Sequence, residues 1–369
     1  MPEVQKVIGL MSGTSLDGVD AAILENDGET IARPGPALTL EYDLEIRDLL
    51  HQALLAARDV SMPGGLQPFL IREAEIASTQ WHAQAVAALL DKAGLKPEQI
   101  GLIGFHGQTI LHRPDRRWTW QIGDGALLAR LTGIDVVNDF RSTDVKAGGQ
   151  GAPLMPLYHV VRARASNLPE PTVVVNIGGV AQVTYISGDT ILAFDTGPGN
   201  APIDDWMQHH HGTPVDQDGA FAASGKINDA ALDKMLANAF FDRKPPKSLD
   251  RLDFGMETAA HLPPADGAAT LTAFTAASLA RAREHFPEPA HTWIVSGGGR
   301  HNKFLMAQLK ARVNAPVLSA EEAGWNGDAL EAEGFAYLAM RAKKGLPLSL
   351  PTTTGVQQPL TGGKLHRKP

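Results

Sequence analysis

Three glycine-rich turns in this chain of 369 residues each follow an apolar, strand-like run. They read SGTSLDG at 12–18, NIGG at 176–179 and SGGG at 296–299. Glycine accepts positive φ and lets backbone N–H groups approach a ligand without an intervening Cβ, so such turns can cradle phosphate oxygens. A single turn of this kind is more often structural. Three of them at strand ends, two in hairpins, favour a bound nucleotide.

The standard phosphate-binding loops are missing from the sequence. The segment nearest to GxxxxGK[ST] is 219–226. Five residues instead of four separate its glycines, and Ile227 stands where the motif needs a Ser or Thr after the lysine, so the segment does not match. No GxGxxG follows the first strand-like run. The remaining hypothesis is a phosphate site built from hairpin turns.

Composition excludes several classes of function. The net charge is −8, and no basic block precedes the final KLHRKP, so a nucleic-acid surface finds no support. The absence of cysteine removes disulfides and thiolate catalysis, and it is compatible with a reducing cytoplasm. The start, MPEVQKVIGL, has neither the pattern of a signal peptide nor a membrane-spanning length of apolar residues. We therefore predict a cytoplasmic protein with no membrane partner.

The elements that must position the first turn follow an α/β pattern. Hydrophobic spacing predicts strands at 7–10 and 19–24 that form a hairpin, and helices at 44–57 and 81–93, the second ending at Gly94. A buried strand at 100–110 should end in a His-Gly turn, Asp124 should open a short helix, and a strand should follow at 134–141.

The second half of the chain repeats this layout. A strand, a glycine turn and a strand are predicted over 171–188, followed by a strand into FDTGPGN, helices at 201–211 and 268–285, and a strand, glycine turn and helix over 291–309. We infer an ancient duplication into two similar lobes. The predicted domains are 1–150, 151–345 and an extended C-terminal tail over 346–369.

A set of longer strings identifies a resemblance. MSGTSLDGVD, FHGQTI, AGGQGAPL, NIGGVA, FDTGPGN, PPKS and GGGRHN, spread from residue 9 to about residue 340, resemble the anhydro-N-acetylmuramic acid kinase family of the sugar-kinase, actin and heat-shock ATPase superfamily. The resemblance implies a two-lobed, actin-like (ribonuclease H-like) α/β fold. Each lobe would carry a mixed sheet with flanking helices, and the active site would lie in the cleft between the lobes.

The resemblance also implies a reaction. The family uses ATP and Mg²⁺ to open 1,6-anhydro-N-acetylmuramic acid hydrolytically and to phosphorylate O6, giving N-acetylmuramic acid 6-phosphate in peptidoglycan recycling. A homodimer in the cytoplasm is implied as well. Asp17 would hold Mg²⁺ through water. The implied ATP-binding residues of the two phosphate turns are Ser12, Gly13, Thr14, Ser15, Leu16, Asp17, Gly18, Val19, Asp20, Gly178 and Gly179. Those of the adenosine motif are Gly297, Gly298, Gly299 and Asn302.

Asp195 in FDTGPGN is the predicted catalytic base, because a carboxylate beside the γ-phosphate can take a proton from the nucleophile. An Asp before Thr-Gly-Pro-Gly is equally good turn chemistry, so spacing alone leaves both readings open. Arg141 is an attractive partner for the lactyl carboxylate, since a guanidinium pairs with it bidentately. The positions that match the family's sugar site are His106, Gln108, Asp139, Arg141, Asp195 and Glu331.

Two other groups have simpler interpretations. Adjacent histidines at 209–211 point in different directions on a helix, so a solvated helix end is favoured over a metal site. Lys247 in PPKS could reach a phosphate, but a lysine after two prolines is usually exposed. The chain departs from the family at Gln182, usually Asn, at Leu249 and Asp250, usually Thr-Gly, and at Leu252, usually Glu. These departures put local contacts in doubt rather than the reaction.

Two alternatives remain open. The chain could be another amino-sugar or carboxylate kinase of the same superfamily, in which Asp195 deprotonates a hydroxyl directly. It could also be an ATP-switched binding or filament protein, whose slow nucleotide turnover would not respond to sugar.

Overall fold

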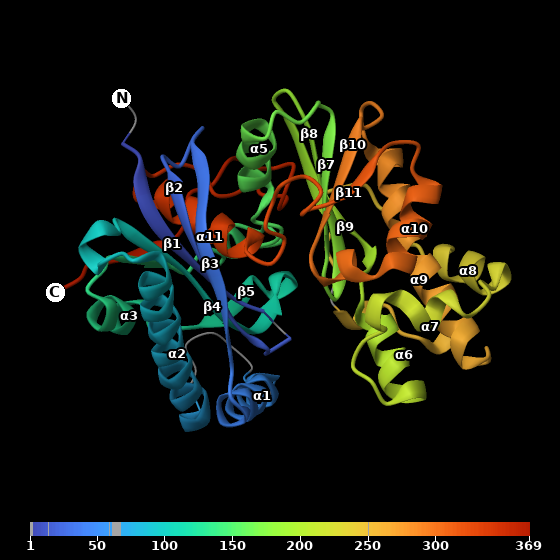
Figure 1. Cartoon of the computed structure of the whole chain (residues 1–369), viewed down its shortest axis with the longest axis horizontal. Coiled ribbons are helices and arrows are strands. Elements are labelled where there is room, and N and C mark those ends of the chain that lie inside the picture. Colours follow the sequence, from blue (N-terminus) through green and yellow to red (C-terminus); the bar gives the residue numbers. More distant parts are fainter. Residues whose placement is uncertain (1–2, 14, 59, 61–67, 250) are drawn as a thin grey trace. The chain divides into compact units, whose positions relative to one another are not determined.

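A computed structural model describes residues 3–13, 15–58, 60, 68–249 and 251–369 (Figure 1). The chain forms two compact units: unit 1 combines Met1–Ala165 with Asp328–Pro369, and unit 2 is Ser166–Gly327. These bounds differ from the predicted 150 and 345, because α11 (Leu330–Lys343) packs on strands β1, β2 and β4 of unit 1 and α5 (Pro156–Ala165) packs on α11. The C-terminal segment after α11 also belongs to unit 1.

Unit 1 is built on a seven-stranded sheet in the order β12-β6-β4-β1-β2-β3, with β5 also paired to β4. Strands β1, β2 and β3 form an antiparallel meander, whereas β4 and β6 extend the sheet in parallel with β1. The strands are β1 Gln5–Ser12, β2 Gly18–Asn26, β3 Ala32–Glu41, β4 Leu102–Arg113, β5 Trp118–Ile122, β6 Val136–Asn138 and β12 Lys364–His366.

Unit 2 repeats this arrangement in a five-stranded sheet in the order β11-β10-β7-β8-β9. An antiparallel meander, β7 to β9, is again followed by two strands parallel to the first. The strands are β7 Thr172–Ile177, β8 Val180–Ser187, β9 Thr190–Pro198, β10 Thr292–Ser296 and β11 Val317–Ser319. Two mixed sheets of the same topology confirm the predicted α/β, ribonuclease H-like fold class and the repeated layout.

The helices of unit 1 cover its sheet and follow the sequence signals in part. Helix α2 ends as predicted, at Gly94 with φ 62°, but it begins well before the predicted residue 81. Asp124 caps α3 as predicted, because its side chain accepts the Leu127 N–H at 2.9 Å. Besides α5 and α11, the helices are α1 Leu44–Arg58, α2 Phe69–Ala93, α3 Gly125–Thr132 and α4 Ser142–Lys146.

In unit 2 the central helix is α9, which is buried along most of its length and contacts α6, α7, α8, α10 and β9. The predicted helix at 268–285 corresponds to most of α9 plus the 3₁₀ turn η6, Ala282–His285. The α-helices are α6 Ala201–His211, α7 Ala220–Ala223, α8 Asp229–Leu236, α9 Pro264–Arg281 and α10 Lys303–Arg312. The remaining 3₁₀ turns of the chain are η1 Pro97–Gln99, η2 Pro114–Arg116, η3 Gln217–Gly219, η4 Arg251–Asp253, η5 Glu257–Ala259 and η7 Gly298–His301.

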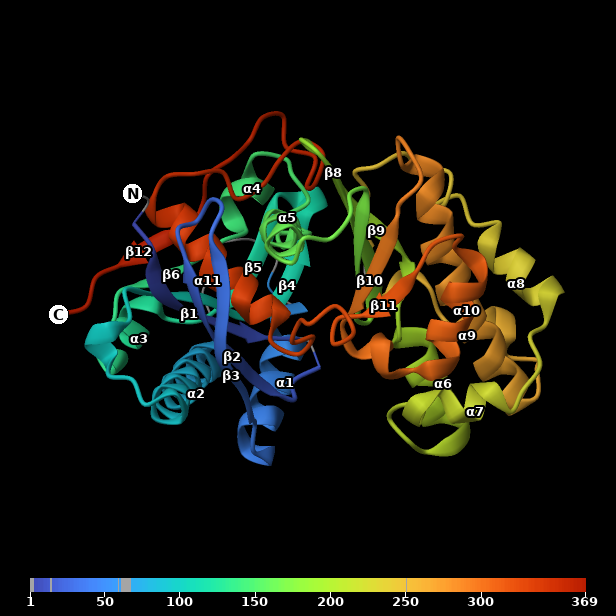
Figure 2. The ribbon, with the colours of Figure 1, turned by 45° about the horizontal axis from the view of Figure 1, so that its top comes forward.

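Three predicted elements differ from the structure. Strand β4 passes through Gly107, at φ 74°, and continues to Arg113, because β5 pairs with its second half. The strand predicted over 134–141 is limited to β6, since Asp139 adopts φ 57° and ends the extended run. The tail is not only extended coil: β12 pairs antiparallel with β6, as Figure 2 shows.

Strand β1 and helix α11 approach each other so closely that only glycine fits between them. A Cβ on Gly9 would lie 1.7 Å from the Ala332 carbonyl oxygen. We expect Gly9→Ala to lower the free energy of unfolding by about 3 kcal/mol, because the helix must move away from the sheet. Gly94→Ala is the control, since Gly94 has positive φ but no atom near its Cβ position; we expect a loss of about 1–2 kcal/mol from φ alone. Urea denaturation measures both, and equal losses would contradict the packing argument.

Candidate active site

The turn between β1 and β2 is held in place by Gln108 of β4. The Gln108 amide nitrogen donates to the Gly13 carbonyl at 3.1 Å, and its oxygen accepts the Ser12 hydroxyl. Ser12 also hydrogen-bonds the Tyr42 hydroxyl at 2.7 Å. The buried Gln108, predicted from the family as a sugar-site residue, therefore fixes the first glycine turn in this structure.

The rest of this turn exposes polar groups and buries apolar ones. Ser15 donates to the Asp17 carboxylate at 2.8 Å, and both side chains are exposed. Leu16, at φ 55°, and Val19 lie in the hydrophobic core. Because their side chains are buried, Leu16 and Val19 can offer a ligand only their backbone groups. Thr14 lies outside the described residues.

Four carboxylates of unit 1 lie near one another beside this turn. Burial, with smaller contributions from the charges of Asp17, Glu331 and Asp328, raises the pKa of Asp20 to about 6, while a hydrogen bond from Thr39 acts in the opposite direction. Among the residues that the structure describes, no three His, Asp or Glu side chains are placed to hold a metal ion by themselves.

The buried His106 and the half-buried Arg141 form a hydrogen-bonded pair in unit 1. The Arg141 Nε–H donates to His106 Nε2 at 3.0 Å, while the His106 Nδ1–H donates to the Gly107 carbonyl at 2.8 Å. Burial and the Arg141 charge hold the pKa of His106 well below its usual value, so the imidazole is neutral. Burial lowers the pKa of Arg141 to about 10, against the opposing effect of Glu331. The structure thus brings His106, Arg141 and Glu331 together.

A chain of hydrogen bonds connects Arg141 to the C-terminal tail. Arg141 Nη1–H donates to the Gly151 carbonyl at 2.6 Å, and the Gly151 N–H donates to Asp144 at 2.6 Å. Asp144 in turn accepts the Thr354 hydroxyl at 2.6 Å. Asp139, the other predicted sugar residue of this region, is exposed between β6 and α4.

In unit 2 three glycine turns meet at the carboxyl ends of β7, β9 and β10. The Asn200 N–H donates to the Gly178 carbonyl at 2.7 Å, and the Gly199 N–H donates to the Gly179 carbonyl at 2.9 Å. A Cβ on Gly199 would lie 2.2 Å from the Gly178 oxygen, and a Cβ on Gly297 would lie 2.6 Å from the oxygen of Ile177. The predicted phosphate and adenosine turns are therefore neighbours within one unit.

The far end of the adenosine motif has a structural task. Asn302 caps α10, because its side-chain oxygen accepts the Leu305 N–H at 2.8 Å. Its side chain is buried. Gly298, by contrast, has nothing nearer to its Cβ position than the Asn200 amide nitrogen at 3.7 Å. In this motif Gly298 therefore leaves room for a ligand, whereas Gly297 and Gly299 are closely packed against Ile177.

Asp195 lies on β9 and is buried, with a relative exposure of 7%. Burial raises the pKa of its carboxyl group to about 7, while the Leu249 N–H, donating to Oδ2 at 2.9 Å, acts in the opposite direction. Its own N–H donates to the Lys247 carbonyl at 3.0 Å. The side chain therefore accepts from a distant segment rather than from its own turn. A buried carboxyl with a pKa near neutrality suits general acid–base chemistry.

Comparison with known proteins agrees with this geometry. The model of the family described as anhydro-N-acetylmuramic acid kinase matches residues 5–368. The chain belongs to the anhydro-N-acetylmuramic acid kinase family. A kinase of that name from Rhizorhabdus wittichii is 52% identical over 98% of this chain and 98% of its own length. One from Paramagnetospirillum magneticum is 52% identical over 97% of this chain and 99% of its own length.

Among solved structures, the chain is similar to component A of (R)-2-hydroxyglutaryl-CoA dehydratase from Acidaminococcus fermentans. The TM-score is 0.49 at 12% identity, covering 91% of this chain and 98% of the other.

The predictions for the histidines at 209–211 and for Lys247 have different outcomes. The histidines at 209–211 are exposed at the end of α6, as predicted. Lys247 is not exposed: its relative exposure is 8%, because its side chain packs between aromatic rings and backbone carbonyls of its own loop. The dipeptide Pro-Pro before it carries no signal of this burial.

Within the described residues, no helix combines the length and apolar character needed to cross a membrane.

Proposed function

We propose that this chain is an ATP-dependent kinase that opens 1,6-anhydro-N-acetylmuramic acid with water and phosphorylates O6. The product is N-acetylmuramic acid 6-phosphate, and the role is peptidoglycan recycling in the cytoplasm. Family membership over residues 5–368 supports the substrate and the reaction. The observation that carries the chemistry is the buried Asp195, with a pKa near 7 beside the glycine turns of unit 2. A homodimer, implied by the family resemblance, stays a prediction.

The nucleotide is proposed to bind at the glycine turns. Residues 12–20 would contact the β and γ phosphates, the turn at Gly178 and Gly179 would contact the phosphates a second time, and 297–299 with Asn302 would contact adenosine. The positions at Gly178 and Gly298 support this, because both are open to an approaching ligand. Backbone N–H groups at such positions are well suited to phosphate oxygens.

The residues of unit 1 fit a Mg²⁺ ion held largely by water and phosphate. Mg²⁺ keeps several waters and takes one or two carboxylates, and the first glycine turn places the Asp17 and Asp20 carboxylates near each other. Asp17 is the proposed carboxylate, acting through water. When bound, the ion would offset negative charge on the phosphates.

Asp195 is proposed to accept a proton from the attacking water. As that proton leaves, the water oxygen bonds to C1 and the bond between C1 and the anhydro oxygen breaks. The oxygen, still attached to C6, then forms a bond to the γ-phosphorus and ADP departs. One carboxylate thus serves both hydrolysis and phosphoryl transfer, and it releases the proton to solvent before the next turnover.

The sugar is proposed to contact His106, Gln108, Asp139, Arg141 and Glu331. The neutral His106 orients Arg141 by accepting its Nε–H, so that the guanidinium is held in one direction. A guanidinium fixed in this way suits a carboxylate, which the lactyl group of the substrate supplies.

The pKa of Asp195 predicts the pH dependence of the reaction. Only the carboxylate form accepts a proton, so we expect kcat/KM to fall about tenfold per pH unit below pH 7. Stability changes in the opposite direction. The folded state binds the proton more tightly than the unfolded chain, so the contribution of Asp195 to the free energy of unfolding is lost as pH rises from about 4 to about 7. A pH–rate profile measures the first effect, and a flat profile between pH 5.5 and 8 would contradict it.

The experiment that tests the proposed function compares ADP release with 1,6-anhydro-N-acetylmuramic acid, with N-acetylmuramic acid and without sugar. We expect rapid release only with the anhydro sugar. Preference for N-acetylmuramic acid would instead support an ordinary sugar kinase of the same superfamily. Slow release that no sugar stimulates would support an ATP-switched binding protein.

A further inference from the structure

The loop that precedes Lys247 returns to the edge of the sheet of unit 2 beside Asp195. Strand β9 is the last strand of that sheet, so one side of its backbone is unpaired by other strands. The segment 247–249 occupies this side: the Lys247 carbonyl accepts the Asp195 N–H at 3.0 Å, and the Leu249 N–H donates to Asp195 Oδ2 at 2.9 Å. The orientation of the carboxylate thus depends on where this segment lies.

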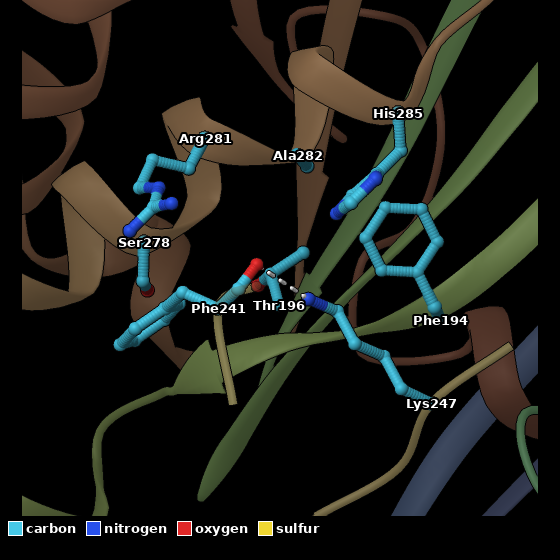
Figure 3. Close-up of a pocket in the computed structure, with 8 residues that line it drawn as sticks. All are labelled: Phe194, Thr196, Phe241, Lys247, Ser278, Arg281, Ala282 and His285. Carbon is cyan, nitrogen blue, oxygen red and sulfur yellow. Dashed lines mark hydrogen bonds between the residues drawn. The ribbon is translucent and has the colours of Figure 1, made fainter. Parts of the chain in front are cut away.

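The side chain of Lys247 fastens the segment to the start of its own loop. Its ammonium group donates to the Phe240 carbonyl at 3.2 Å and to the Phe241 carbonyl at 3.4 Å. It also lies 4.6 Å from the centre of the Phe240 ring and 5.8 Å from that of Phe194 on β9. Figure 3 shows the ammonium pointing toward Phe241. Both residues line a cavity of about 10 Å³.

The charges around this lysine do not hold it there. Burial, together with the charges of Arg281 and Arg243, lowers the pKa of Lys247 to about 8, while Glu284 and Asp242 act in the opposite direction. His285 also lines the cavity. A cation that is kept away from bulk water needs compensating contacts. The two carbonyls and the aromatic faces supply them.

We propose that Lys247 is a positioning residue for Asp195: by tying the segment 247–249 to residues 240–241, it holds the Leu249 N–H against the carboxylate that acts as base. This inference rests on the proposed function, because it assumes the role of Asp195. The proposal assigns Lys247 no direct contact with phosphate or sugar.

The proposal predicts a particular kinetic change. The pKa of Asp195 is set by burial, which raises it, and by the Leu249 N–H, which lowers it. Lys247→Met keeps the apolar bulk between the rings but removes the ammonium donors, so the segment is released and the hydrogen bond weakens. We expect kcat to fall about tenfold and the acid limb of the pH–rate profile to move to higher pH. The KM for ATP and the KM for the anhydro sugar should change little.

Three variants of one loop test this, with ADP release driven by the anhydro sugar as the readout and thermal melting as the check of folding. Lys247→Arg restores the donors and should recover most of the activity. Lys244→Met changes an exposed lysine of the same loop and should match the wild type. If Lys247→Met does not fold, Lys247→Gln replaces it, because its shorter side chain cannot reach both carbonyls.

The outcomes separate this proposal from the proposed function. A wild-type kcat and an unmoved acid limb in the Met or Gln variant would overturn the positioning role, as would equal losses in the Met and Arg variants. If Asp195→Asn is inactive while Lys247→Met matches the wild type, only the positioning role fails. If Asp195→Asn keeps full turnover, the assignment of the base fails instead.

Discussion

Asp195→Asn should lower kcat by about 10²–10⁴-fold while leaving ATP binding intact. The amide has nearly the shape of the carboxylate, and its oxygen can still accept the Leu249 N–H, which donates to Oδ2 at 2.9 Å in the wild type. What it loses is the capacity to take a proton from water. The measurement is steady-state turnover of the anhydro sugar at pH 8, together with the heat of ATP binding.

Asp204 on α6 provides the rival for this role. Burial raises its pKa to about 7 as well, with Asp205 raising it and Arg251 lowering it. Asp204 is less buried than Asp195. We expect Asp204→Asn to retain most of the turnover. Near-normal turnover in Asp195→Asn together with loss of turnover in Asp204→Asn would assign the base to Asp204 on α6 instead of Asp195 on β9.

The second large effect concerns Arg141. Arg141→Met should raise the KM for the anhydro sugar by about 10- to 100-fold, because hydrogen bonds to a charged group contribute about 1.5–3 kcal/mol. The wild-type guanidinium is held by His106 at 3.0 Å and by the Gly151 carbonyl at 2.6 Å, so it is oriented before a carboxylate arrives. Initial rates at saturating ATP give the KM.

A substrate change provides the control. The 1,6-anhydro derivative of N-acetylglucosamine lacks the lactyl carboxylate, so the wild type should bind it weakly and Arg141→Met should bind it no worse. Arg141→Lys keeps the charge without the planar pair of donors and should fall between the wild type and Met. An equal rise in KM for both sugars would show that Arg141 acts on the fold rather than on the carboxylate.

Much of the fold was predictable because its signals are local. The hairpin β1–β2 follows from short runs of β-branched residues around a polar glycine turn, and α3 follows from the Asp124 cap. Helix α11 carries no such signal. It is buried on nearly all sides, from Leu330 to Met340, so its apolar residues show no one-sided helical period. Strand β12 has only three residues and exists through its pairing with β6.

The packing of the glycines followed from the sequence in part, and the contacts of the polar residues less so. Gly297, which lies in a predicted glycine turn, is required by close backbone approach, and so is Gly199, which lies outside the three predicted glycine turns. Gln108 and Asn302 matched family motifs, yet in this structure one holds a turn and the other caps a helix. The burial of Lys247 depends on Phe240 and Phe241, whose carbonyls reach it only through the folded loop. Tertiary contacts of this kind leave no periodic pattern in a sequence.

The route of oxygen during turnover tests the central claim most directly. The reaction is run with ATP and 1,6-anhydro-N-acetylmuramic acid in H₂¹⁸O, and the product is analysed promptly by mass spectrometry and phosphorus NMR. Our account predicts one ¹⁸O at C1 and phosphate on an unlabelled O6, with the label absent from Asp195→Asn reactions. Phosphate on C1, or a phosphorylated sugar with no ¹⁸O at C1, would contradict it.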